Sequence, residues 1–292
     1  MAISRRDLIR TGAGALALAG VSETGSMAQS PPQEADPSGS GTWHGLKLSV
    51  ASYTFHGQPR DVAIKGIVRT GLQYVSIKDV HLPFDTTPEQ RKEIAQQFKA
   101  AGITPLSCGN VGMKNDEASL RKAFEYARDI GLPTIVCAPP AEAMPLLDKL
   151  VKEFDIKLAI HNHGPEDKKF PTPESVYTVA KGFDKRIGLC IDVGHTARAG
   201  ADPVKDILRF HDRLYDMHMK DVGNTTPRGP AREVGRGVLD IHGMFEALIK
   251  IKYTGLVSFE YEKNDADPLP GLMESVGYVR GILHGIKGSV PA

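Results

Sequence analysis

Short apolar runs alternate with segments of helical periodicity from residue 46 almost to the end of the chain. A bounded apolar run predicts a buried strand, whereas apolar residues that recur every three or four positions predict a helix. The apolar runs predict strands at 46–53, 73–78, 103–108, 134–138, 157–161, 187–192, 214–219 and 256–260. The periodic segments predict a helix after each strand, at 59–70, 87–101, 117–130, 141–154, 173–181, 203–211, 241–250 and 272–284.

Eight strand–helix units within about 245 residues predict a closed (β/α)8 TIM barrel that forms a single domain. The predicted strands show little alternation of apolar and polar residues, which is typical of a parallel sheet buried on both faces. A doubly wound open sheet is the main alternative. The turn after the first strand lacks the Gly-x-Gly-x-x-Gly pattern of that fold, which favours the barrel.

The first 28 residues predict a targeting segment. The stretch from Ser4 to Arg10, with Arg5 and Arg6, precedes a short run rich in Gly and Ala, and small residues follow at 26–28. This stretch resembles a twin-arginine signal, although a chance pair of arginines is an alternative. The apolar run is too short for a membrane anchor. The resemblance implies export of the folded chain to a bacterial periplasm or the exterior.

The segment 29–45 is rich in Pro, Gly and Ser and predicts a flexible linker, which leaves 46–292 for the barrel domain. Removal of residues 1–28 would take away three basic and two acidic residues, leaving 33 of each. A neutral body gives no electrostatic attraction for nucleic acid or an anionic membrane surface. Cys108, Cys137 and Cys190 lie in apolar runs, and their odd number favours buried thiols over a disulfide framework.

Charged and imidazole side chains stand at the ends of four successive predicted strands. They are Asp192, His218, Glu260 and the pair His161 and His163. The strand ends of a barrel meet at one mouth, which holds the active site. Two carboxylates with one or two imidazoles suit a divalent metal ion, such as Mn²⁺, Zn²⁺, Co²⁺ or Mg²⁺. The bland alternatives are polar residues that cap strands, and a buried salt bridge from the two carboxylates to a lysine, Lys220.

Several motifs resemble those of the sugar phosphate isomerase/epimerase family of xylose isomerase-like barrels, over the whole body from about residue 46. They are His161-Asn-His-Gly-Pro-Glu166, Asp192 with His195, His218-Met-Lys-Asp221, Gly235-Arg-Gly-Val-Leu-Asp240 and Tyr253-Thr-Gly-Leu-Val-Ser-Phe-Glu260. The resemblance implies that Asp192, His218 and Glu260 are metal ligands. Many relatives carry a glutamate where this chain has His161, so the fourth ligand is left open among His161, His163 and Glu166.

The same substitution bears on the mechanism that the resemblance implies. In the relatives, two metal-bound glutamates remove and return a proton on opposite faces of a sugar carbon, while the metal polarises the neighbouring carbonyl. Here only Glu260 is in place, so His163 or Glu166 would serve the opposite face. The remaining polar residues at the mouth predict contacts with substrate, and these are Tyr53, His56, Lys78, His81, Asn110, His195 and Lys220. For Lys78 an ion pair with Asp79 is an equal alternative.

The leading hypothesis is a metal-dependent isomerase or epimerase that acts on a sugar or keto-sugar through an enediolate. The first alternative is a lyase or dehydratase that eliminates from a 3-keto-glycoside at the same metal site, and the second is a non-catalytic carbohydrate-binding barrel. Endonucleases of abasic DNA share the fold, but they need a basic groove that this neutral chain lacks. The expected partner is a small carbohydrate, unphosphorylated if the chain is exported. Neither nucleic acid nor a stable membrane anchor is expected, and a homo-oligomer is left open.

Overall fold

The computed structural model describes residues 42–286, which form a closed barrel of eight parallel strands. Each strand pairs with its sequence neighbours, and the first pairs with the last to close the barrel. The strands are β1 (Lys47–Ala51), β2 (Tyr74–Ile77), β3 (Thr104–Gly112), β4 (Thr134–Ala138), β5 (Lys157–His161), β6 (Ile187–Asp192), β7 (Leu214–Met219) and β10 (Leu256–Phe259). This confirms the predicted single TIM-barrel domain.

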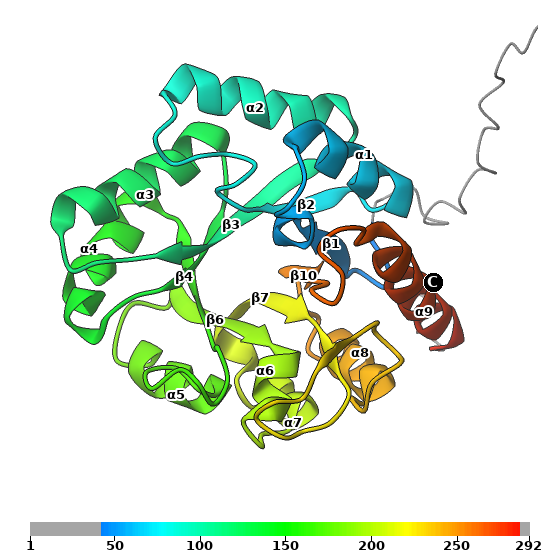
Figure 1. Cartoon of the computed structure of the whole chain (residues 1–292). Coiled ribbons are helices and arrows are strands. Elements are labelled where there is room, and N and C mark those ends of the chain that lie inside the picture. Colours follow the sequence, from blue (N-terminus) through cyan, green and yellow to red (C-terminus); the bar gives the residue numbers. More distant parts are fainter. Residues whose placement is uncertain (1–41, 287–292) are drawn as a thin grey trace, which may run out of the picture. The chain divides into compact units, whose positions relative to one another are not determined.

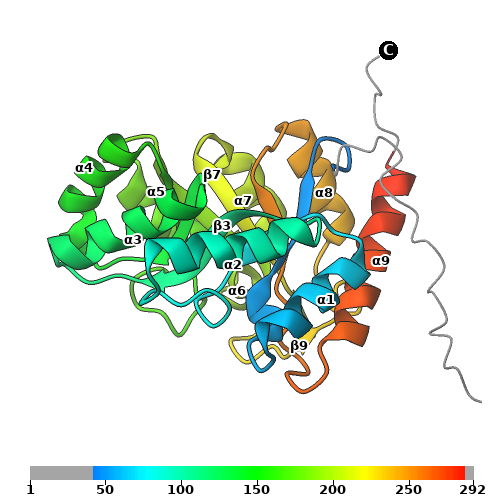
Figure 2. The ribbon, with the colours of Figure 1, turned by 90° about the horizontal axis from the view of Figure 1, so that it is seen from above.

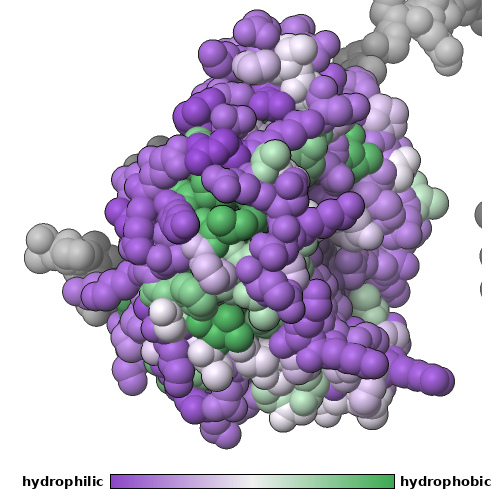
Figure 3. Space-filling model, turned by 90° about the vertical axis from the view of Figure 1, so that its left-hand side faces the viewer, coloured by the Kyte–Doolittle hydropathy of each residue, from purple (hydrophilic) through white to green (hydrophobic). Residues whose placement is uncertain are grey.

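Helices surround the strands as an outer ring (Figure 1), and the side view shows them lying along the barrel wall (Figure 2). They are α1 (Arg60–Thr70), α2 (Pro88–Ala100), α3 (Glu117–Ile130), α4 (Met144–Phe154), α5 (Pro173–Ala180), α7 (Pro203–Arg209), α8 (Ile241–Lys250) and α9 (Leu269–Gly285). Their apolar stripes face the strands, so residues such as Ile67, Phe98 and Phe124 are fully buried. The side of the molecule that carries α3 and α4 is mainly hydrophilic, with apolar side chains gathered near its middle (Figure 3).

The structure differs from the prediction mainly at the mouth of the barrel. The first strand ends at Ala51, and Ser52–Phe55 form a 3-10 helix. The third strand runs on to Gly112 instead of ending at Cys108. An additional helix, α6 (Val193–Arg198), starts directly after β6, because the carboxylate of Asp192 accepts a hydrogen bond from the backbone N–H of His195 and caps it.

The structure also differs from the prediction in two of the connections between strands and helices. A two-stranded antiparallel hairpin follows β7, formed by β8 (Asp221–Val222) and β9 (Ala231–Arg232), which the apolar pattern did not indicate because each strand has only two residues. The helix predicted at 141–154 begins as a 3-10 turn over Ala141–Ala143 before α4. All three cysteines are free and buried, as predicted.

The predicted twin-arginine signal at 1–28 lies outside the described residues, as does most of the predicted linker. The last part of that linker, 42–45, forms a turn in which Trp43 is buried against the ring of His284 at 5.2 Å between centroids. None of the helices within 42–286 is long and apolar enough to cross a membrane.

A buried arginine ties the start of β7 to the connection between α5 and β6. Arg213 is 8% exposed. Its guanidinium donates hydrogen bonds to four backbone carbonyls, those of Ala180, Phe183, Asp184 and Ile187, at 2.8–3.1 Å. These carbonyls lie between the last residue of α5 and the first residue of β6, where helical partners run out. The arginine adds charged donors to them and so holds this connection in place.

We expect Arg213→Met to lower the free energy of unfolding by about 3 kcal/mol, because the buried carbonyls lose charged hydrogen-bond donors. Urea denaturation followed by circular dichroism measures the change. Arg209→Met is the matched control, since Arg209 forms an exposed ion pair with Glu174 at 2.8 Å and such pairs contribute at most about 1 kcal/mol. Equal losses in the two variants would contradict a structural role for Arg213.

Candidate metal centre and active site

Four buried side chains meet where β5, β6, β7 and β10 reach the mouth of the barrel. His161 ends β5, Asp192 ends β6, His218 lies in β7 and Glu260 follows β10. The registers align them, because Asp192 is opposite His218, and His218 is opposite Ser258, two residues before Glu260. None of the four is more than 9% exposed. Parallel strands therefore bring together groups that are far apart in sequence.

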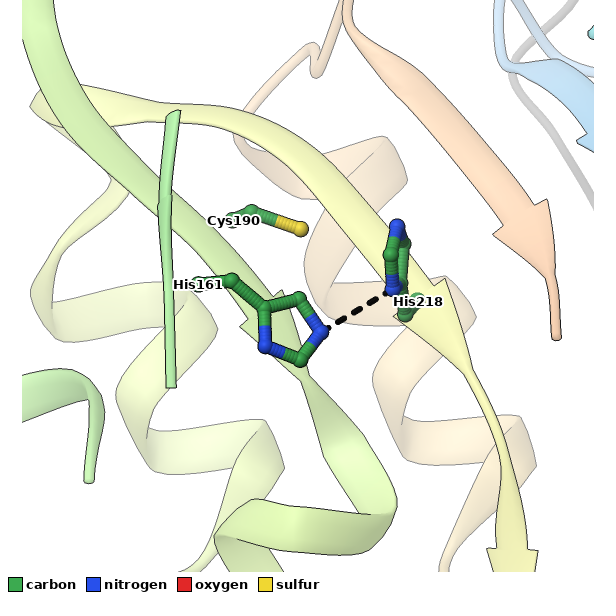
Figure 4. Close-up of side chains that lie close together, drawn as sticks. All are labelled: His161, Cys190 and His218. Carbon is green, nitrogen blue, oxygen red and sulfur yellow. Dashed lines mark hydrogen bonds between the residues drawn. The ribbon is translucent and has the colours of Figure 1, made fainter. Parts of the chain in front are cut away.

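The donor atoms of these four residues face one another. The Nε2 atom of His161 lies 3.0 Å from Nδ1 of His218 and 3.6 Å from Oδ2 of Asp192. The same His218 nitrogen lies 3.3 Å from Oε2 of Glu260. One donor atom from each residue lies within 4.8 Å of all the others. Figure 4 shows the two imidazoles turned toward each other, with the Cys190 side chain beside them.

This donor set fits a divalent metal ion. Asp192 Oδ2 is fully buried and has no hydrogen-bond partner among the described residues, although buried polar atoms are nearly always bonded. Two imidazoles with two carboxylates suit a first-row divalent ion. Cys190 forms an alternative cluster with both imidazoles. Burial raises the pKa of its thiol to about 12, which favours the protonated thiol when no metal is bound.

Hydrogen bonds around Asp192 orient its carboxylate. Its Oδ1 atom accepts from the His195 backbone N–H at 2.7 Å, which leaves Oδ2 facing the cluster. Its own backbone N–H donates to Oδ1 of Asn162 at 3.0 Å, and the Asn162 amide donates to Thr196 Oγ1 at 3.1 Å. Asn162 thereby joins the end of β5 to the start of α6. Supports of this kind hold metal ligands in place.

The ammonium of Lys220 lies among three carboxylates. Its Nζ atom is 3.4 Å from Asp192 Oδ2, 3.0 Å from Glu260 Oε2 and 2.6 Å from Glu262 Oε2. Burial alone would lower the lysine pKa, but the three carboxylates outweigh it and hold the pKa well above its usual value. Burial alone would raise the pKa of Asp192, but the charges of His195 and Lys220 outweigh it. They hold the pKa well below its usual value, so the carboxylate stays ionised.

The two cluster imidazoles have opposite pKa shifts. Burial lowers the pKa of His161 to about 3, so its ring is neutral and carries a free lone pair at neutral pH. Burial also disfavours a charge on His218, but the Glu260 carboxylate 3.3 Å away outweighs it and raises the pKa well above the usual value. A cation at the cluster would favour the neutral, ligating form of both rings.

A cavity of about 210 Å³ opens above the cluster. It is lined by Tyr53, Lys78, Asn110, His161, His163, His195, Lys220, Glu260 and Glu262. The Asn110 amide donates to His163 Nε2 at 2.6 Å, and His163 Nδ1 faces the Asp167 carboxylate at 3.3 Å. The imidazole of His163 is therefore oriented from both sides. Imidazole, carboxylate and ammonium groups converge on a space of the size of a small polar molecule.

Three of the residues predicted for the site are placed elsewhere. His56 stacks on Tyr53 with ring centroids 4.5 Å apart and does not line the cavity. His81 is fully buried, and both its ring nitrogens are hydrogen-bonded, to Ser52 Oγ and to the Gln58 carbonyl. Glu166 is exposed and pairs with Arg198, because the turn at Gly164, where φ is +82°, carries the chain toward α6.

The sequence interpretation missed two contributors, Glu262 and Asn162. Glu262 lies two residues after Glu260, and side chains two apart on an extended chain share a face, so this spacing was the available signal. Asn162 stands between two predicted histidines, and nothing in the sequence shows that it bonds to Asp192.

Comparison with known proteins agrees with this architecture. The model of the xylose isomerase-like TIM barrel family matches residues 64–282. The chain belongs to this family. As a xylose isomerase-like barrel it is 32% identical over 141 residues to the rhizopine catabolism protein MocC of Rhizobium meliloti, a match that covers 42% of each chain. It is 27% identical over 133 residues to an inosose dehydratase of Geobacillus kaustophilus, covering 40% of this chain and 42% of that protein.

These matches span less than half the length of the curated relatives. Among solved structures, a 3-keto-D-glucoside 4-epimerase from E. coli superposes with a TM-score of 0.65 at 16% identity, over 81% of this chain and 99% of that one. At that identity the likeness concerns the barrel fold. The family and its epimerase and dehydratase neighbours are enzymes.

We expect Lys220→Met to lower the free energy of unfolding of this xylose isomerase-like barrel by about 3–5 kcal/mol in EDTA, because Asp192 and Glu260 lose their buried counter-charge. Adding Mn²⁺ should recover most of this loss, since a divalent cation replaces the ammonium. Thermal melts with EDTA and with Mn²⁺ measure both effects. Lys65→Met, which removes an exposed pair with Asp61, is the control; a Lys220 variant as stable as this control would contradict the interpretation.

Proposed function

We propose that this chain is a metal-dependent enzyme that moves the proton next to the carbonyl group of a keto-sugar. The observation that carries the proposal is the cluster of His161, Asp192, His218 and Glu260 beneath a cavity lined by proton-transfer groups. A non-catalytic carbohydrate-binding barrel has no need for two buried carboxylates whose donor atoms converge with those of two imidazoles. The cluster therefore favours catalysis over binding alone.

Four residues would hold the metal ion, with His161 as the fourth ligand. His161 lies within the cluster, whereas His163 faces Asn110 and Glu166 faces Arg198. A divalent cation bound there would polarise a substrate carbonyl and stabilise the negative charge that develops when the adjacent proton leaves. The neutral imidazole of His161 completes the donor set without adding a third negative charge.

Two different proton-transfer groups line the cavity from strands that are not neighbours. Glu260 follows β10 and His163 follows β5, and these strands are separated in the barrel by β6 and β7. A carboxylate on one face of a substrate carbon and an imidazole on the other can remove a proton and return it to the opposite face. The Asn110 amide holds the imidazole, and release of that hydrogen bond frees Nε2 to accept a proton. This arrangement supports isomerisation or epimerisation.

The unlike pair also supports elimination, the second candidate function. After Glu260 removes the proton, the imidazolium of His163, formed when Nε2 leaves Asn110 and takes up a proton from water, could protonate a leaving hydroxyl group or glycosidic oxygen instead of protonating carbon. The match to an inosose dehydratase is the observation that favours this dehydratase or lyase. Both candidates share their first step and differ only in what the second group protonates.

The other residues of the cavity would orient the substrate. Lys78 donates to the Asn110 carbonyl at 3.1 Å and has Tyr53 beneath its ammonium at 5.4 Å, so it presents a fixed charge beside an aromatic face. Hydroxyl groups of a sugar can accept from Lys78 and Lys220 and donate to Glu262. Export through the predicted signal would expose the enzyme to unphosphorylated sugars, and the proposal includes them as substrates.

The metal proposal predicts a specific pattern of stabilisation. At about one hundred times its dissociation constant, Mn²⁺ should stabilise the native chain by about 2.7 kcal/mol and raise the melting temperature by roughly 5–10 °C. Asp192→Asn and His161→Ala should abolish this rise, whereas His163→Ala should keep it. Differential scanning fluorimetry with a manganese titration tests the pattern. A rise that survives in His161→Ala would contradict its assignment as a ligand.

The proton-transfer proposal predicts solvent exchange. Incubation of the manganese-loaded chain with free and glycosidic keto-sugars in D₂O should place deuterium on the carbon next to the carbonyl, which NMR detects. His163→Ala should slow product formation by at least about 100-fold, as loss of a general acid–base does, with metal affinity unchanged. Deuterated epimer identifies an epimerase, and an unsaturated product identifies a lyase. No exchange with any keto-sugar would refute the proposal.

A further inference from the structure

A bulge interrupts β3 where it reaches the barrel mouth. The pairing of β3 with β4 shifts register between Cys108 and Val111, so Gly109 and Asn110 leave the regular ladder. At Gly109 φ is +125°, and a Cβ atom there would lie 2.1 Å from the Val136 carbonyl oxygen, so the position requires glycine. Bulges beside active sites redirect side chains. Here the bulge takes Asn110 out of the regular pairing between β3 and β4.

Asn110 lines two neighbouring hollows, a cavity and a groove. On one side it lines the cavity above the metal cluster, where its amide holds His163 at 2.6 Å. On the other side it lines a groove of about 340 Å³. The adjacent residues Lys78 and Asp79 divide in the same way, the lysine lining the cavity and the aspartate the groove. The cavity and the groove are therefore neighbours that meet at Asn110.

The groove differs from the cavity in character. Its apolar lining is supplied by Phe84, Val111, Met113, Leu120 and Ala123, from the end of β3, the loop after β2 and the first turns of α3. Phe84 packs on the ring of Tyr126 with centroids 4.3 Å apart, so this wall is fixed. Polar groups, among them Lys114, Ser119 and Lys122, also line it, and all three are exposed. The cavity, by contrast, is lined almost entirely by titratable side chains.

We infer that the substrate is a glycoside whose keto-sugar ring occupies the cavity and whose apolar, aromatic aglycone occupies the groove; this inference rests on the proposed function. A sugar ring finds hydrogen-bond partners in the cavity, and the groove offers a mainly apolar surface of the kind that binds a flat hydrocarbon group. A second sugar ring would place some of its hydroxyl groups against the apolar side chains of Phe84 and Met113, which is unfavourable. The two hollows together match one polar and one apolar half of a single molecule.

The test compares three substrates on the manganese-loaded full chain: phenyl 3-keto-β-glucoside, 3-keto-cellobiose and free 3-keto-glucose. We expect kcat/KM for the phenyl glycoside to exceed the value for the free sugar by roughly tenfold or more, the discrimination that an apolar contact of this size supports. In Met113→Asp the ratio of the two values should fall to about one, because the aromatic ring meets a charge. Met113→Leu should keep the ratio, and so should Val238→Asp, which alters an exposed residue outside both hollows.

A second measurement separates failure of the groove from failure of the proposed reaction. Saturation-transfer NMR with unreactive phenyl β-glucoside should show strong transfer to the phenyl ring, lost in Met113→Asp or, if that variant does not fold, in Ser119→Trp, which fills the groove. Transfer to the ring without turnover of any keto-sugar would refute the proposed function and leave the groove standing. Equal kcat/KM for the phenyl glycoside and the free sugar, or a preference for 3-keto-cellobiose, would overturn the aglycone assignment.

Discussion

The burial of Asp192 and Glu260 at the barrel mouth is the constraint on which the rest of the site depends. A buried carboxylate is costly unless a cation or several hydrogen bonds compensate it. Here Lys220 contacts both, and His161 and His218 each lie against one of them. The strand register creates this concentration of charge, because it places the ends of β6, β7 and β10 at one level. The same charge that would destabilise an empty apolar core gives the mouth the donor groups on which the proposed cation site and the proposed proton transfer rest.

Much of the architecture could be predicted from the chain because the signals are local and repeated. Short apolar runs separated by helical periods indicate the barrel, and the barrel alone implies that Asp192, His218 and Glu260 meet. The details at the mouth were less predictable. Helix α6 depends on capping by Asp192, and the bulge of β3 depends on a backbone conformation that only Gly109 can adopt, so neither leaves an apolar pattern. Those irregular segments carry His195 and Asn110 into the cavity.

Which of several nearby polar residues lines the site depends on turn geometry, which the spacing of residues along the sequence does not encode. His161 ends β5, and His163 and Glu166 follow it within a few residues, yet the three have different surroundings. His161 joins the metal cluster, His163 is held by Asn110, and Glu166 is drawn to Arg198. The turn at Gly164 separates the last two. Roles that were open alternatives in sequence are thus distinguished by where the chain bends.

The charges of the site depend on an imidazole at His161 and a carboxylate at Glu262. Three carboxylates, those of Asp192, Glu260 and Glu262, contact one ammonium, that of Lys220. With a divalent cation on the cluster the formal charges cancel, because the neutral imidazole of His161 adds none. If residue 161 were a glutamate, one negative charge would be left over in a buried place, unless Glu262 were neutral. In the proposed metal site, the imidazole of His161 would keep the ligands at two negative charges, while Glu262 contacts Lys220 at the cavity and balances its charge.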